Sequence, residues 1–188
     1  YGVPDALDDE LARLLRRSGC EGINFCVDHT DDRFLKFFEK GFSFEDVKRA
    51  VKICKKWGIK VMTDLLIGAP GETYASVKKV VEDIRTLAPY RAGLSYGIRV
   101  YPNTKLFQYL SKSHPLPALF LRPYFYISES IKDGIEDFVS ELIEDDEIFL
   151  SNLKDRKEKN YNYNSNTLLE EAIKEGYRGA FWDILAMR

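Results

Sequence analysis

Apolar residues in the first 110 positions follow two alternating spacings. Apolar residues three or four positions apart predict helices, and alternating or continuous apolar runs predict strands. The predicted strands span 22–28, 59–67 and 94–101, and the predicted helices span 4–17, 33–39, 43–57, 73–87 and 104–110. Alternation of helices and strands is typical of a parallel sheet with right-handed crossovers. The pattern therefore predicts an α/β fold with a parallel sheet.

Short polar signals mark where several of these helices begin. Asp5 is placed to cap the first helix, 4–17. Ser43 and Asp46 resemble a capping box, with Asp at the position where Glu or Gln is more usual. These signals indicate where the helices begin, so that loops connect the end of each strand to the next helix.

The predicted strands carry an unusual polar face. Strands covered on both sides normally consist of near-continuous apolar residues. Here one face of two strands is polar, and its residues are Asn24, Cys26, Asp28, Ser95, Arg99 and Tyr101. If the strands curve into a barrel, these side chains face a lumen that holds water or a ligand.

A glycine-rich turn, Gly68-Ala69-Pro70-Gly71-Glu72, follows the second predicted strand and precedes a helix. Its glycines allow backbone angles that other residues resist and let a ligand approach the main chain. Turns at the carboxyl ends of parallel strands are the usual ligand sites of α/β proteins. A tight connection between strand and helix that binds nothing has the same pattern. The surrounding residues must therefore show whether this turn binds a ligand.

Several side chains near the predicted strand ends could bind a ligand. Asp28 or Glu72 could accept hydrogen bonds from ribose hydroxyls or an amino group, and Arg99 could hold a carboxylate. An internal Asp28–Arg99 ion pair is the competing interpretation. His29, at a strand exit, is a better candidate than His114, but a single loop histidine is more often solvated or hydrogen-bonded than catalytic.

Composition narrows the classes of function. The 188 residues are 45% hydrophobic and 31% charged, with a net charge of −2, which offers no basic field for nucleic acid. No apolar run is long enough to span a bilayer, and no signal peptide is visible. Cys20, Cys26 and Cys54 match no metal-ligand spacing, so a reducing cytoplasm is expected and no metal ligand is assigned.

Residues 113–188 are less regular than residues 1–112. A strand or packed extension is expected over 123–127, and amphipathic helices are expected within 129–147 and over 167–175. We therefore divide the chain into a half-barrel, 1–112, and a mainly helical carboxyl-terminal extension, 113–188.

Five segments, 19–28, 41–47, 58–73, 101–106 and 176–185, resemble the second half of a radical S-adenosylmethionine (SAM) barrel. The likeness is greatest to members that carry a cobalamin-binding domain upstream. The resemblance implies a partial (β/α)6 barrel of which this chain holds the last three strands. It also implies an iron–sulfur enzyme, a family classed among oxidoreductases, with SAM at the carboxyl ends of the strands.

The resemblance implies cofactor contacts at three strand ends. They are Asp28, His29, Gly68, Ala69, Pro70, Gly71, Glu72, Arg99, Tyr101 and Pro102. The family usually has Glu-Ser-Gly where this chain has Asp28-His29-Thr30, which is a departure from the pattern. No catalytic residue is assigned.

The cysteine motif that holds the four-iron cluster in this family, Cys-x3-Cys-x2-Cys, does not occur in the 188 residues. The resemblance implies SAM and a 4Fe-4S cluster whose ligands lie outside this chain, and the likeness to members with a cobalamin-binding domain adds cobalamin as a candidate cofactor. We therefore expect the carboxyl-terminal segment of a larger enzyme, inactive alone. Its open sheet edge would be covered by an amino-terminal half-barrel or by a second copy in a homo-oligomer.

Two alternatives remain open. A non-catalytic half-barrel could serve as a binding or assembly module through its open edge and its acidic helix. A different α/β-barrel enzyme could bind phosphate where the helix begins at Thr73, although the turn carries no basic residue.

Overall fold

The computed structural model describes residues 1–113, 116, 123–144, 146–151 and 167–186. His114 lies outside these ranges. Within them, no helix is both long enough and apolar enough to cross a membrane.

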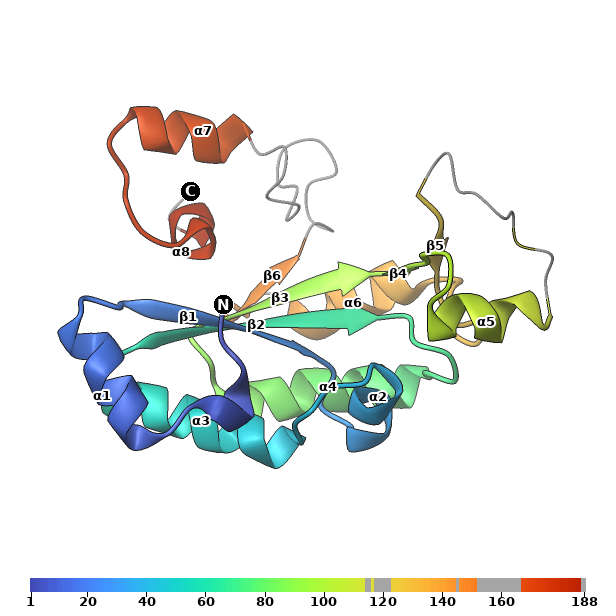
Figure 1. The fold of residues 1–188 in the computed structure, drawn as a ribbon. Coiled ribbons are helices and arrows are strands. Elements are labelled where there is room, and N and C mark those ends of the chain that lie inside the picture. The colour runs from blue at the N-terminus through green and yellow to red at the C-terminus, as the bar shows by residue number, and fades with distance from the viewer. Residues whose placement is uncertain (114–115, 117–122, 145, 152–166, 187–188) are drawn as a thin grey trace.

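A parallel four-stranded sheet forms the centre of the fold (Figure 1). Its strands lie in the order β1 (Gly22–Asp28), β2 (Lys60–Ile67), β3 (Arg91–Tyr96) and β6 (Phe149–Ser151). The predicted α/β class and parallel pairing are confirmed. β6 was not predicted, and it adds residues from beyond position 112 to the sheet.

The helices lie on both sides of this sheet. They are η1 (Pro4–Ala6), α1 (Asp9–Arg17), α2 (Asp32–Phe37), α3 (Phe44–Lys56), α4 (Tyr74–Leu87), α5 (Lys105–Ser111), α6 (Ile135–Ile143), α7 (Thr167–Lys174) and α8 (Phe181–Ala186). Figure 1 shows α1, α3 and α4 beneath the sheet and α8 above it, near the beginnings of the strands. One-sided cover by the crossover helices is the arrangement of a half-barrel.

The first predicted helix is two elements rather than one. Leu7 has an extended backbone and is buried, so the chain leaves the helical path between η1 and α1. The cap predicted at Asp5 is wrong: the Asp8 carboxylate accepts the N–H of Leu11 at 2.7 Å. The capping box of Ser43 and Asp46 is confirmed at the start of α3.

The third predicted strand, 94–101, is also divided. β3 ends at Tyr96, and Gly97 turns the chain with a φ of 79°. The next strand, β4 (Ile98–Arg99), pairs antiparallel with β5 (Phe125–Tyr126), outside the main sheet. A positive φ at Gly97 is incompatible with a continuous strand, and the pairing of β4 with β5 holds the chain in its new direction.

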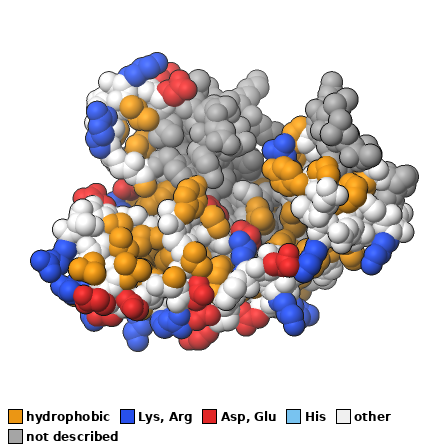
Figure 2. Space-filling model, in the orientation of Figure 1, with side chains coloured by type: hydrophobic (Ala, Val, Ile, Leu, Met, Phe, Trp, Pro, Cys, Tyr) orange, Lys and Arg blue, Asp and Glu red, His pale blue; other side chains and the backbone are white. Residues whose placement is uncertain are grey.

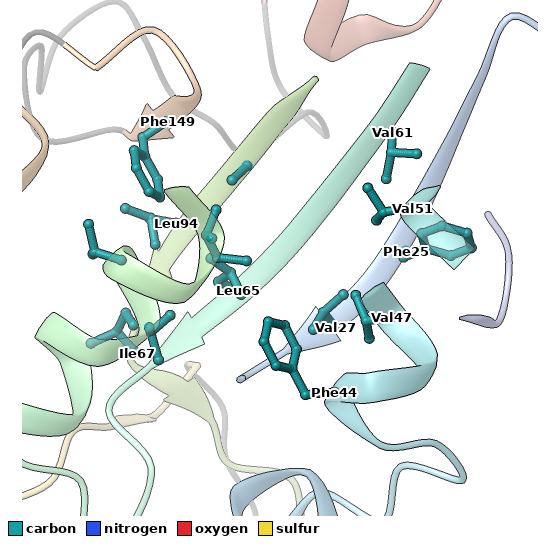
Figure 3. Packing of buried hydrophobic residues seen from close by; sticks show 14 of the residues in the cluster. Phe25, Val27, Phe44, Val47, Val51, Val61, Leu65, Ile67, Leu94 and Phe149 are labelled. Atoms are coloured by element: carbon teal, nitrogen blue, oxygen red, sulfur yellow. The ribbon is translucent and has the colours of Figure 1, made fainter. Parts of the chain in front are cut away.

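The core fills the space between the sheet and the helices beneath it (Figure 3). Phe25 and Val27 point from β1 toward Val47 and Val51 of α3. The predicted alternation along β1 is thus confirmed, since Phe25 is buried while its neighbour Cys26 is exposed on the other face. Burial of this apolar face fixes which side of the sheet remains polar.

α8 covers the polar face where the three long strands begin. The Trp182 ring packs on Gly22, where a Cβ atom would lie 2.9 Å from the ring. The Asp183 carboxylate accepts hydrogen bonds from Lys60 Nζ at 2.6 Å and Tyr90 Oη at 2.9 Å. α8 therefore contacts residues at the start of β1, β2 and β3 and closes that end of the polar face.

The outer edge of β1 carries no strand within the described residues. Gly2 alone forms a parallel bridge there, donating its N–H to the Asn24 carbonyl at 2.9 Å. Large apolar side chains are exposed beside this edge: Tyr1, Val3, Leu11 and Leu14. Figure 2 shows hydrophobic side chains gathered over this side of the molecule.

Candidate functional site

The glycine turn lies at the carboxyl end of β2 and is shaped from inside by Glu72. This side chain is fully buried. Its Oε2 atom accepts the N–H of Gly68 at 2.6 Å and the N–H of Ala69 at 2.9 Å. Charge-assisted bonds of this kind are stronger than neutral ones, so Glu72 holds the two amides in fixed directions.

The two glycines of the turn have different surroundings. Gly68 has a φ of 123°, and a Cβ atom there would lie 3.2 Å from the Ile127 Cα. Gly71 has a φ of 82° and open space where its Cβ would be. Pro70 is half-buried and Ala69 is fully buried. The accessible side of the turn is therefore the Pro70–Gly71 side.

A later segment braces the same turn. The Ser128 N–H donates to the Gly68 carbonyl at 3.0 Å, and the Ser130 hydroxyl donates to the Glu72 carbonyl. No sequence signal marked these serines, because they lie far along the chain in an irregular segment.

His29 connects the exit of β1 to this turn. Its Nδ1 atom accepts the N–H of Asp31 at 2.8 Å, and its Nε2 atom lies 3.3 Å from Glu72 Oε1. Both side chains are buried. The structure thus joins two of the predicted site residues directly.

Asp28 ends β1 in a left-handed conformation, with a φ of 65°. Its carboxylate pairs with Lys40 Nζ at 2.6 Å. Burial raises the pKa of Asp28, and the adjacent Lys40 opposes that rise. Asp28 therefore has Lys40 as its ion-pair partner, and the Asp28–Arg99 pair considered from the sequence does not form. Lys40 follows α2 and carried no signal of this role.

Arg99, Tyr101 and Pro102 lie together beyond the end of β3. All three are exposed, and the Arg99 guanidinium lies 4.8 Å from the centre of the Tyr101 ring. The Gly97 N–H donates to the Ile67 carbonyl at 2.8 Å, which holds this segment beside the glycine turn. Figure 1 places β4 and β5 at the end toward which β2 and β3 run.

The predicted contact residues therefore form two neighbouring groups at one end of the sheet. His29 contacts Glu72 of the 68–72 turn, and Asp28 precedes it at the end of β1. Residues 99–102 follow Gly97, whose N–H donates to the Ile67 carbonyl next to the turn. Whether any of them binds SAM stays a prediction. Glu72 and His29 lie behind the turn rather than on its accessible side.

No group of three or more His, Cys, Asp or Glu side chains within the described ranges is placed to hold a metal ion. Cys20 is half-buried, Cys26 is exposed on the sheet and Cys54 is buried in α3. The cysteines described here thus do not form a cluster site.

Cys26 is expected to react slowly with alkylating agents despite its exposure. Its Sγ lies 3.7 Å from Asp64 Oδ2. Partial burial of the thiol, reinforced by the carboxylates of Asp64 and Asp28, raises the pKa of Cys26 to about 11 from 9.0. At pH 8 its thiolate fraction, and its rate of reaction with iodoacetamide, should be about a hundredfold below that of an ordinary thiol.

Iodoacetamide kinetics in a Cys20→Ser, Cys54→Ser background isolate this thiol. An Asp64→Asn substitution removes one of the charges and should increase the rate. A rate at pH 8 equal to that of free cysteine would contradict the expected environment.

Known proteins resemble this chain in sequence and in fold. The model of the radical SAM superfamily matches residues 3–84. A tryptophan 2-C-methyltransferase of Streptomyces laurentii is 35% identical over 108 residues, which is 54% of this chain and 18% of the relative. An uncharacterised methyltransferase of Pyrococcus horikoshii is 27% identical over 139 residues, 74% of this chain and 30% of the relative.

Solved structures give the same result. The radical SAM methyltransferase TsrM of Kitasatospora setae, with tryptophan and a SAM analogue bound, superimposes with a TM-score of 0.80 at 25% identity, covering 97% of this chain and 43% of TsrM. TsrM with cobalamin and a [4Fe-4S] cluster gives a TM-score of 0.75 over 98% of this chain.

The chain spans less than half the length of these proteins. The two curated relatives named above are described as methyltransferases, which gives no support to the expected oxidoreductase class. The matched residues, the parallel sheet and the superposition on TsrM agree. This chain is similar to the radical SAM superfamily over residues 3–84 and resembles the superfamily's cobalamin-associated members.

Proposed function

We propose that this chain is the carboxyl-terminal part of a radical SAM barrel in a larger methyltransferase, where it contributes contacts to SAM and substrate. The observation that carries the proposal is the braced turn at the carboxyl end of β2. Glu72 fixes the Gly68 and Ala69 amides from inside, and the Pro70–Gly71 side remains accessible. Methyl transfer is proposed because two matched relatives are described as methyltransferases.

The residues around the turn fit SAM. Pro70 and Gly71, on the accessible side of the turn, would lie against the adenine, and the buried Gly68 and Ala69 would hold the turn behind them. The exposed ring of Tyr101 is a further candidate contact. Bound SAM would supply the methyl group. Asp28 is a carboxylate that could accept a ribose or amino hydrogen bond while Lys40 balances its charge. Arg99 and Pro102 would lie toward adenine or substrate.

The iron–sulfur cluster does not fit the described residues of this chain. The three cysteines of the chain lie in three different places: Cys20 in a loop, Cys26 in the sheet and Cys54 in a helix. We propose that the cluster ligands, and any cobalamin site, are supplied from outside the 188 residues, and that the chain is inactive alone.

The open edge of β1 is the proposed place of attachment for the rest of the barrel. The parallel bridge at Gly2 has the direction that a preceding barrel strand would need. The exposed apolar residues Leu11 and Leu14 would then be covered by the helix of the preceding unit. A homo-oligomer that covers the same edge is the competing arrangement.

The test is amide hydrogen exchange in the complete enzyme with and without S-adenosylhomocysteine, a SAM analogue. Binding should slow exchange in the 68–72 turn and in residues 99–102. Exchange on α7, far from the strand ends, serves as the internal control. Unchanged exchange in the turn at saturating analogue would contradict the proposal.

A non-catalytic binding or assembly module remains the second candidate, favoured by the exposed apolar residues beside the β1 edge. It predicts a stable oligomer of this chain with no affinity for SAM. Sedimentation of the chain and calorimetric titration with SAM distinguish the two functions.

A further inference from the structure

His29 and Glu72 form a buried contact between the exits of two neighbouring strands. His29 Nε2 lies 3.3 Å from Glu72 Oε1, and the two side chains are 1% and 0% exposed. Neither atom has a hydrogen-bond partner of good geometry within the described residues. The contact is therefore electrostatic, between a polarised ring nitrogen and a carboxylate oxygen in a setting where water screens little.

The hydrogen bonds of the imidazole assign its proton. Nδ1 accepts the N–H of Asp31 at 2.8 Å, so it carries a lone pair. In the neutral ring the proton is then on Nε2, the atom that faces Glu72. The His29 side chain thus presents a donor to the carboxylate oxygen that the turn does not use.

The loop that carries His29 is fixed independently of this contact. The Thr30 hydroxyl donates to Asp83 of α4 at 2.7 Å. The Phe34 ring lies 4.3 Å from the imidazole, centre to centre. Contacts other than the one to Glu72 therefore hold the imidazole in place, so the imidazole can act as a fixed support for the Glu72 carboxylate.

We propose that His29 is a positioning residue, which acts through Glu72 to hold the glycine turn in its ligand-binding shape. Glu72 Oε2 accepts both turn amides, and this alone leaves the carboxylate able to tilt about its terminal bond. A fixed group at Oε1 restricts that tilt and keeps Gly68 and Ala69 aligned. The proposal rests on the proposed SAM contact at this turn.

The test compares two His29 variants with a matched control in the complete enzyme. His29→Leu removes the donor, and His29→Gln retains a side-chain N–H. The control is Glu82→Ala, which removes an exposed carboxylate on α4 that pairs with Lys78 at 3.9 Å and has no contact with His29 or Glu72. SAM affinity is measured by titration calorimetry, and exchange of the Gly68 and Ala69 amides is measured without ligand.

We expect His29→Leu to weaken SAM binding about tenfold and to speed exchange at both amides. His29→Gln should restore most of the affinity, and Glu82→Ala should leave both readouts unchanged. His29→Leu should add little in a Glu72→Gln background, because the effect passes through Glu72.

Equal exchange at Gly68 and Ala69 in His29→Leu and the wild type would overturn the inference. Fully additive losses with Glu72→Gln would do the same. If the wild-type enzyme does not bind SAM, the proposed function fails, but the exchange measurement without ligand still decides the role of His29.

Discussion

Replacing Glu72 with alanine is expected to lower the free energy of unfolding by about 3 kcal/mol. The substitution removes the acceptor of two buried amides, those of Gly68 and Ala69. It also leaves the Nε2 proton of His29 facing an apolar methyl group. Urea denaturation of the protein measures the loss.

Glu82→Ala is the matched control for this experiment. Glu82 lies on α4, and its exposed carboxylate is 3.9 Å from Lys78. Exposed pairs contribute little, so its denaturation midpoint should stay that of the wild type. Glu72→Gln keeps one acceptor oxygen and should fall between the two. A midpoint for Glu72→Ala equal to that of Glu82→Ala would show that Glu72 does not support the turn.

Replacing Trp182 with alanine is expected to weaken the docking of α8 by about 3 kcal/mol. The ring is 3% exposed and packs on Gly22, with Tyr90 at 5.8 Å between ring centres. Loss of the ring leaves a cavity, and Gly22 has no side chain that could fill it. Exchange of the Asp183 and Ile184 amides should become about a hundredfold faster.

Ile173→Ala provides the control in the same part of the chain. Ile173 lies on α7 and is 51% exposed, so its truncation removes little packing. Exchange on α8 should then match the wild type. If Trp182→Ala also leaves α8 protected, the polar bonds of Asp183 hold the helix without the ring.

The sequence predicted the part of the fold that depends on repeated local patterns. The alternation of Ile23, Phe25 and Val27 places β1 with its apolar face toward α3, as the structure confirms. The capping box at Ser43 likewise involves residues three positions apart. Patterns of this kind can be recognised because every contributing residue lies within one element.

Features that depend on distant contacts were not predictable. β6 is three residues long and pairs with β3 across a long stretch of chain, so its pattern is too short to recognise. The break at Gly97 depends on β5, which arrives later in the chain. A glycine within an alternating run was compatible with a continuous strand as well as with a turn.

In the candidate site, too, local features were predictable and features that depend on distant contacts were not. The turn at 68–72 was recognised from its own residues, and its place at the strand end is confirmed. The role of Glu72 was not recognised, because a glutamate in a loop is normally solvated and nothing nearby in sequence showed that it is buried. Lys40 and Ser130 reach the site from separate elements and therefore left no local signal. His29 was predicted from its place at a strand exit, but its contact with Glu72 was not predictable from the sequence.

The contact of α8 with the strand beginnings also bears on how the protein is synthesised. Asp183 binds Tyr90, 93 positions earlier, and Lys60, 123 positions earlier. At ribosomal rates of 5–20 residues per second, about 5 to 20 s separate the appearance of Tyr90 from that of Asp183. During that interval β1, β2 and β3 can already be paired while the polar ends of Lys60 and Tyr90 remain in water. In the nascent chain, the pairing of β1, β2 and β3 can thus precede the docking of α8 over the end of the sheet where these strands begin.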